Sequence, residues 1–296
     1  MSRSNTTKKQ HYVPQVYLKG FSGDQKHIWR YHLDPFDAGK LVPIESVCRR
    51  NYLYEIRDNT GGLERTNWIE NVLAQFEGRY ATYLRDLERK AFHEANFKTK
   101  CFLNSNEKLF WKLYVAVQIM RTPEVINTAN AVVKDFFDKQ LSKDEQYMVA
   151  LSQCLPFFNQ LKEEDKNVFS VFLKPLLGMS IAIGVDLEGT LYTSDNPVYC
   201  YVPPYEDFAQ INEYEEVIMP LTTKLVLILL GGEKKKEYDK NRLFRLEADD
   251  LKGVKSSVAY TANVQLFSQN KLAKEDVALI TQVRNDKEKD KNQIRG

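Results

Sequence analysis

MSIAIGVDLEGTLYTSDNPVYCYVP, residues 179–203, contains two strand-like runs on either side of the turn DLEGT. The Asp195-Asn196-Pro197 step breaks the second run, because proline cannot donate to a strand ladder. EEVIMPL (215–221) and KLVLILLGG (224–232) follow as two more apolar runs that end at a proline and at two glycines. The second half of the chain therefore predicts a mostly antiparallel sheet with at least three strands between residues 178 and 230.

The middle of the chain, roughly residues 63–176, has the periodicity of helices instead. A predicted helix runs from Leu63 to about Ala91, because aromatic and apolar side chains recur there at spacings of three and four: Trp68, Val72, Phe76, Tyr80 and Tyr83. A second predicted helix spans Asn104 to Arg121, with Ser105 as its cap and Glu107 in its first turn. Helical patterns continue from Pro123 to about Gln140, at 143–154 and at 161–176.

Both ends of the chain add further elements. HIWRYHLDP (27–35) and NYLYEI (51–56) predict two strands, and 247–269 predicts a last long helix. The charged tail RNDKEKDKNQIRG (284–296) is typical of a frayed or disordered segment. The order of strands, helices, strands and helix predicts an α+β fold. We expect one domain over residues 8–270, with a helical middle packed on a mostly antiparallel sheet and flexible tails at 1–7 and 285–296.

Composition excludes several classes of protein. The net charge is +2, far from that of a generally basic nucleic-acid-binding protein, although a local basic site remains compatible with it. Four cysteines lie about fifty residues apart, a spacing that fits neither a zinc knuckle nor a disulfide framework. No apolar run approaches the roughly 18–20 residues that span a bilayer, and residues 1–10 do not resemble a secretory signal. We expect a cytoplasmic protein with reduced thiols and no membrane contact.

Polar residues interrupt apolar patterns at three places. Near the start of the chain, Gln10-His11-Tyr12 precedes an apolar segment, and histidine is the side chain best suited to proton transfer near neutral pH. The alternative is a half-buried structural histidine. In VAVQIMRTP (115–123), Gln118 and Arg121 share one helix face. A buried arginine there forms a structural ion pair or presents its guanidinium to a phosphate or carboxylate ligand.

The third place is Ser194-Asp195-Asn196-Pro197, at the end of a strand-like run. An Asx turn is a sufficient structural explanation of this step. As a functional alternative, the Asp195 carboxylate could orient His11, accept a proton or hold a cation. Glu70 and Glu77 lie two turns apart on one predicted helix face and could join Asp195 around Mg²⁺, but solvated glutamates are far commoner on helices. NTP-binding, Rossmann, α/β-hydrolase and HExxH metalloprotease motifs are absent from the sequence.

QHYVPQVYLKGF (10–21) resembles the opening of the bacterial domain-of-unknown-function family 4238. IWRYHLD, QIMRTP and YTSDNPV followed by MPLT match that family's outline in the same order, so the resemblance covers about residues 8–270. It implies a fold, no settled activity and a place in bacterial defence or conflict systems. The matched positions of interest are His11, Tyr12, Pro14, Gln118, Arg121, Asp195, Asn196 and Pro197. Their recurrence in one family pattern implies that His11, Arg121 and Asp195 line one pocket.

Two functional hypotheses follow from these residues. The first is a nuclease-like hydrolase that needs no cofactor, or Mg²⁺ as a variant. His11 would be its acid or base, Asp195 would fix the His11 tautomer and Arg121 would neutralise phosphate charge. Its ligand-binding residues would be Lys8, Lys9, Gln10, Tyr12, Gln118 and Asn196. The alternative is a non-catalytic module whose pocket binds a small anionic ligand or a partner protein.

Overall fold

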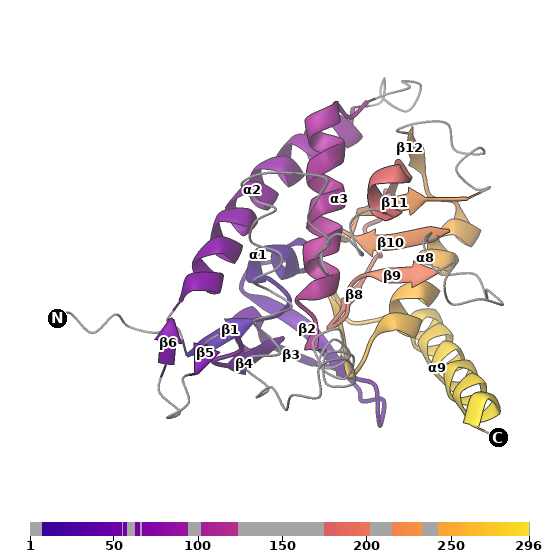
Figure 1. Ribbon diagram of the computed structural model, residues 1–296. Coiled ribbons are helices and arrows are strands. Elements are labelled where there is room, and N and C mark those ends of the chain that lie inside the picture. Colours follow the sequence, from indigo (N-terminus) through magenta and orange to yellow (C-terminus); the bar gives the residue numbers. More distant parts are fainter. Residues whose placement is uncertain are drawn as a thin grey trace.

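A five-stranded sheet with the strand order β12-β7-β11-β10-β9 occupies the centre of the structure (Figure 1). The computed structural model describes residues 8–54, 56–57, 63–65, 67–93, 102–123, 175–201, 215–232 and 242–295. The five strands are β7 (Ser180–Val185), β9 (Tyr199–Tyr201), β10 (Glu216–Pro220), β11 (Leu225–Leu230) and β12 (Arg242–Arg245). Only β12 pairs in parallel, with β7, and the other pairs are antiparallel. The prediction of at least three strands between 178 and 230 is confirmed.

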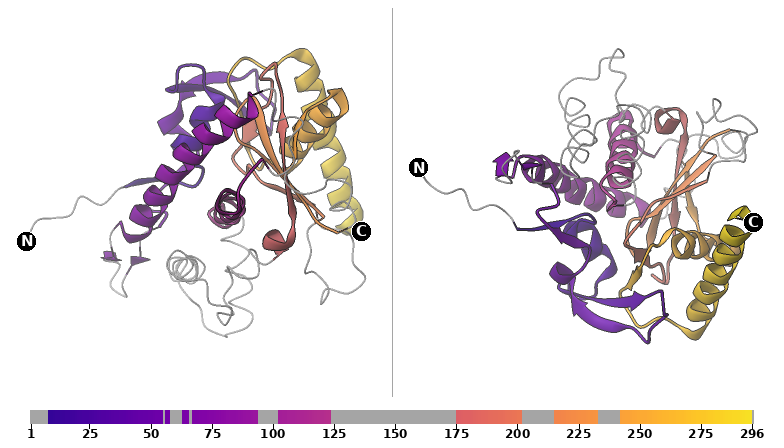
Figure 2. Two further views of the ribbon diagram at one scale, coloured as in Figure 1. Left: turned by 90° about the horizontal axis from the view of Figure 1, so that it is seen from above. Right: turned by 60° about the horizontal axis from the view of Figure 1, so that its bottom comes forward.

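Helices cover both faces of this sheet (Figure 2). α2 (Trp68–Ala91) and α3 (Ser105–Met120) lie on one face, and α8 (Ala248–Thr261) lies on the other. Alternate residues of β11 serve the two faces. Leu225, Leu227 and Leu229 pack toward α2 and α3, whereas Val226, Ile228 and Leu230 pack toward α8. A strand that is buried on both faces has no solvent-exposed side, so its residues need not alternate between apolar and polar. This explains the continuous apolar runs in the sequence.

A second, four-stranded antiparallel sheet has the order β3-β2-β13-β8. Its strands are β2 (His27–His32), β3 (Lys40–Pro43), β8 (Thr193–Ser194) and β13 (Gln265–Ser268). α9 (Lys274–Arg295) packs on α8 through the fully buried Ile280, which shares a cluster with Val258. Two small ribbons complete the sheets, β1 (Lys9–His11) with β4 (Arg49–Asn51) and β5 (Ile56–Arg57) with β6 (Leu63–Arg65). The predicted α+β class with mostly antiparallel sheets is confirmed.

α3 begins at a capping box. Asn104 accepts a hydrogen bond from the Glu107 amide at 3.0 Å, and Glu107 accepts one from the Asn104 amide at 2.7 Å. Two otherwise unpaired amides are thereby satisfied, which stabilises the first turn. The cap is Asn104, so the prediction of Ser105 was wrong by one residue. Three members of the stripe predicted on α2, Phe76, Tyr80 and Tyr83, pack against α3. The Tyr83 and Phe110 rings stack with centroids 3.9 Å apart.

Four sequence-based boundaries differ from the structure. The run 51–56 is not one strand, because Tyr52 has a φ of 51° and turns the chain after β4. Residues 63–65 form β6, and the helix starts only at Trp68. The helix predicted over 247–269 ends at Thr261, and β13 follows it. The charged segment from 284 lies in α9, where Arg284 donates to the Ala262 carbonyl at 2.8 Å. The helices predicted across 124–174 fall outside the described residues.

Candidate functional site

The N-terminal segment is packed into the body of the protein, as the sequence predicts. It forms β1, the short helix α1 (Gln15–Leu18) and the 3₁₀ turn η1 (Lys19–Phe21). The fully buried apolar side chains are Val13, Tyr17, Leu18 and Phe21, whereas Tyr12 and Val16 are only partly buried. Burying a large apolar side chain contributes about 1.5–3 kcal/mol, so the four together offset much of the ordering of this segment.

Tyr17 and Gly20 connect this segment to the central sheet. The Tyr17 hydroxyl donates to the Pro220 carbonyl at 2.6 Å and lies 2.7 Å from the Thr193 hydroxyl. The Thr223 amide donates to the Gly20 carbonyl at 3.1 Å. A β-carbon at residue 20 would lie 2.8 Å from the Leu221 carbonyl oxygen, so this approach requires glycine. The segment thus reaches strand ends about 170–200 residues away in the sequence.

Arg121 connects the same segment to the helices. Its guanidinium is buried, donates to Glu77 of α2 at 3.0 Å and donates to the His11 carbonyl at 2.6 Å. A third, longer hydrogen bond of 3.4 Å runs to the Tyr54 hydroxyl. A buried guanidinium needs such partners, because an unpaired buried charge costs several kcal/mol. The predicted burial and pairing of Arg121 are confirmed.

Two glutamines also hold the backbone of the N-terminal segment. Gln118 donates to the Tyr12 carbonyl at 3.1 Å, and Gln10 accepts from the Tyr54 amide at 2.6 Å. Both side chains are fully buried. Gln118 Oε1 and the Tyr114 hydroxyl have no hydrogen-bond partner among the described residues, and buried atoms of this kind are ordinarily satisfied by ordered water. These glutamines therefore position main chain next to Arg121.

The His11 ring points to a different set of partners. Nε2 lies 3.3 Å from the Glu45 carbonyl oxygen, and Nδ1 lies 3.5 Å from the Gln15 amide nitrogen. The carbonyl can only accept, so the neutral ring carries its proton on Nε2 and keeps the Nδ1 lone pair. Burial lowers the pKa of His11 below its ordinary value of 6.5, and the positive charges of Arg121 and Arg49 lower it further. His11 is therefore a neutral, oriented imidazole at pH 7.

A basic surface surrounds His11 on the β1–β4 ribbon. Arg49 stands directly opposite His11 in the strand register, and Lys9 lies on the same face of β1, two residues away. Four cations gather on this ribbon and form no hydrogen bond or ion pair through their side chains with any described residue: Lys8, Lys9, Arg49 and Arg50. Sequence reasoning singled out the two lysines but missed the arginines. The adjacent arginine pair before a strand-like run was the available signal.

Asp195 and Asn196 join β8 to the turn between α8 and β13. The buried Asp195 carboxylate accepts from the Asn263 amide at 2.9 Å and from the Val264 amide at 3.0 Å. Burial raises the pKa of Asp195, and these amides oppose that rise. Asn196 donates to the Thr261 carbonyl at 3.3 Å. Burial raises the pKa of Tyr12 and of Cys48, and the nearby Asp195 carboxylate raises both further. The hydrogen bonds of the His11 ring do not include Asp195.

The structure thus brings His11 and Arg121 together through the His11 main chain, whereas the Asp195 carboxylate is used at another turn. Fixing of the tautomer, which the sequence assigned to Asp195, is instead accomplished by the Glu45 carbonyl. Glu77 pairs with Arg121. No group of three or more metal-ligating side chains occurs within the described parts of the chain. A single pocket shared by His11, Arg121 and Asp195 stays a prediction.

Replacing Asp195 by alanine is expected to lower the free energy of unfolding by about 1–3 kcal/mol, because two backbone amides lose their acceptor. Asn263 and Val264 are partly exposed, so water replaces part of that loss. Asp195→Asn should lie between the alanine variant and the wild type, since one amide oxygen can still accept. Urea unfolding measures both, with the exposed Asp249→Asn as control. Unchanged stability of both variants would contradict this role of Asp195.

The family model described as "Protein of unknown function (DUF4238)" matches residues 9–272. The chain belongs to the DUF4238 family. No curated protein and no solved structure matches it. The DUF4238 match spans the N-terminal segment, Arg121 and the Asp195 turn. No helix within the described part of this DUF4238 protein is long and apolar enough to cross a membrane.

Proposed function

We propose that the β1–β4 ribbon binds the phosphate backbone of a nucleic acid and that His11 transfers a proton as a phosphodiester bond is cleaved. The observation that carries this proposal is the pairing of His11 with Arg49 across the ribbon, next to Lys9. Cationic side chains without a protein partner are suited to phosphate, and a neutral histidine among them is suited to proton transfer. A nuclease of this kind fits a bacterial defence or conflict system.

The chemistry assigns each group a separate task. Nδ1 of His11 would take the proton of the attacking hydroxyl or water, displacing the long contact to Gln15. The Glu45 carbonyl keeps the opposite nitrogen protonated and stabilises the imidazolium that forms. Arg49 and Lys9 would hold the phosphate and offset its growing charge. Arg121 acts as a positioning residue, because Glu77 and the His11 carbonyl already occupy its guanidinium.

Incubation of the purified protein with labelled RNA, single-stranded DNA and duplex DNA, with and without Mg²⁺, tests this function. We expect cleavage of at least one substrate by the wild type and its loss in His11→Ala. His93→Ala is the matched control, since His93 is exposed at the end of α2 and lies outside the ribbon. The absence of cleavage on all three substrates would overturn the hydrolase proposal.

A binding module without catalysis is the second candidate. It is favoured by the partners of the His11 ring, which are a carbonyl and an amide rather than a carboxylate. Fluorescence anisotropy across a salt series separates the two candidates. Arg49→Ala should weaken binding and reduce the slope of log K against log salt by about 1, because one phosphate contact is lost. Salt-dependent binding without cleavage would support the module, and binding with no dependence on salt would contradict both candidates.

A further inference from the structure

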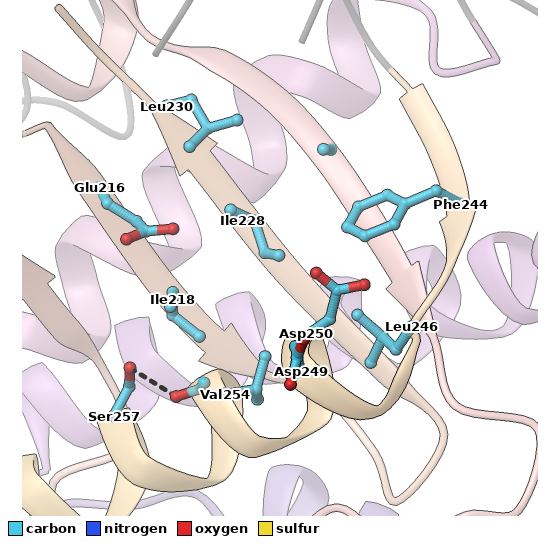
Figure 3. A pocket seen from close by; sticks show the side chains of 12 residues that line it. Glu216, Ile218, Ile228, Leu230, Phe244, Leu246, Asp249, Asp250, Val254 and Ser257 are labelled. Carbon is cyan, nitrogen blue, oxygen red and sulfur yellow. Dashed lines mark hydrogen bonds between the residues drawn. The ribbon is translucent and has the colours of Figure 1, made fainter. Parts of the chain in front are cut away.

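A cavity of about 240 Å³ lies between α8 and the sheet face opposite α2 and α3 (Figure 3). Its apolar walls come from several elements, including Ile218 of β10, Ile228 of β11 and Phe244 of β12. Val254 closes the side formed by α8. None of these residues belongs to the ribbon or to the Arg121 cluster, so the cavity is a separate feature of the fold.

Among the described residues that line this cavity, all the charged side chains are acidic. Glu216 extends from β10, and Asp249 and Asp250 extend from the first turn of α8 (Figure 3). Asp250 caps the helix by accepting from the Glu247 amide at 2.9 Å, whereas Asp249 forms no hydrogen bond or ion pair with any described residue. Acidic residues in a first helical turn interact favourably with the helix dipole, which accounts for Asp249 and Asp250. The dipole does not account for Glu216, because Glu216 belongs to β10. Arg242 of β12 is a cation near this wall, and its guanidinium lies 5.9 Å from the centre of the Phe244 ring.

We propose that this cavity binds a small organic monocation, an amine with a compact apolar body. The apolar walls favour a hydrocarbon or aromatic group, and the carboxylates favour a positive charge at the edge. A water molecule takes about 30 Å³ in the liquid, so the cavity has the volume of about eight waters and suits a ligand of roughly that many heavy atoms. This size lies below the range of drug-sized pockets and excludes a nucleotide or a folded peptide.

Calorimetric titration with phenethylamine tests this inference, with phenethyl alcohol as its neutral analogue and 3-phenylpropionate as an anion of similar shape. We expect the amine to bind at least about fivefold more tightly than the alcohol, and the anion not to bind. Asp249→Asn should weaken the binding of the amine by about three- to fivefold and leave the affinity for the alcohol unchanged. Asp286→Asn, an exposed carboxylate on α9 paired with Lys289, is the matched control.

Ile228→Trp fills the cavity and should abolish binding of the amine and the alcohol. If this variant fails to fold, Asp249→Asn still decides the role of charge, because Asp249 is exposed and supports no core packing. Equal binding of the amine and the alcohol, binding of the anion, or no binding of the amine up to about 10 mM would each overturn the proposal. His11→Ala should bind the amine like the wild type, so this result is independent of the nuclease assay.

Discussion

Arg121→Ala is expected to lower the free energy of unfolding by about 3–5 kcal/mol. The substitution leaves Glu77 without its buried cation and the His11 carbonyl without its shortest donor. Glu77 is partly exposed and can be rehydrated, whereas the His11 carbonyl lies where the N-terminal segment meets α3. The loss should therefore include detachment of that segment as well as the broken ion pair.

Guanidinium chloride unfolding measures the effect. Arg49 is partly exposed and forms no ion pair with any described residue, so Arg49→Ala should change stability by at most about 0.5 kcal/mol. Glu77→Gln is a milder companion variant, because it keeps one acceptor for the guanidinium, and its loss should be smaller. If Arg121→Ala does not fold, Glu77→Gln still measures how much the Arg121–Glu77 ion pair contributes to stability. A loss below about 1 kcal/mol in both variants would show that the buried pair does not hold the segment.

His11→Gln is expected to lower the rate constant of the proposed cleavage by about 10²–10⁴-fold, the usual contribution of a general acid or base. Glutamine keeps a donor for the Glu45 carbonyl but cannot take up a proton. The pKa of His11 in the folded protein lies below 6.5, so the neutral form prevails at pH 7. Activity of the wild type should fall as the pH drops toward this lowered pKa, and any activity left in the variant should lack this acid limb.

The same pKa shift makes a prediction for stability. The unfolded chain binds a proton at His11 more readily than the folded protein, so the free energy of unfolding decreases as the pH falls from 6.5 toward the lowered pKa. Above 6.5 both states are neutral at this position and the contribution is flat. His11→Gln should remove that part of the pH dependence. Identical pH profiles of stability for variant and wild type would mean that the folded His11 titrates like the unfolded one.

Local sequence patterns were sufficient to predict the strands and helices that are buried on both faces. β7, β10 and β11 are continuous apolar runs, and α3 has an apolar face that ends at Arg121. Burial of the N-terminal segment was also predictable, because apolar side chains are concentrated close to the start of the chain. In each case the residues that decide the structure lie within one short window.

Contacts between residues far apart in the sequence determine the structure where the sequence-based predictions were wrong. The Asp195 carboxylate holds the amides of Asn263 and Val264, and this contact is made just beyond the end of α8, where a longer helix was expected. α9 is highly charged, yet Ile280 and a salt bridge from Asp276 to Lys255 fasten it to α8. The partners of the His11 ring depend on the register of β1 with β4 and on the turn at Glu45. No local pattern encodes these pairings.

β13 lies between β2, from near the start of the chain, and β8, from its second half. Trp29 of β2 pairs with Ser268 of β13, and the same strand pairs with Thr193 on its other edge. A ribosome adds roughly 5–20 residues per second, so roughly 10–50 s separate the synthesis of these two partners. β2 therefore emerges from the ribosome long before β13 has been synthesised. Until then Ile28 and Tyr31, which are fully buried in the folded protein, stay exposed to solvent. We expect nascent chains that stop before β13 to be substrates for holding chaperones.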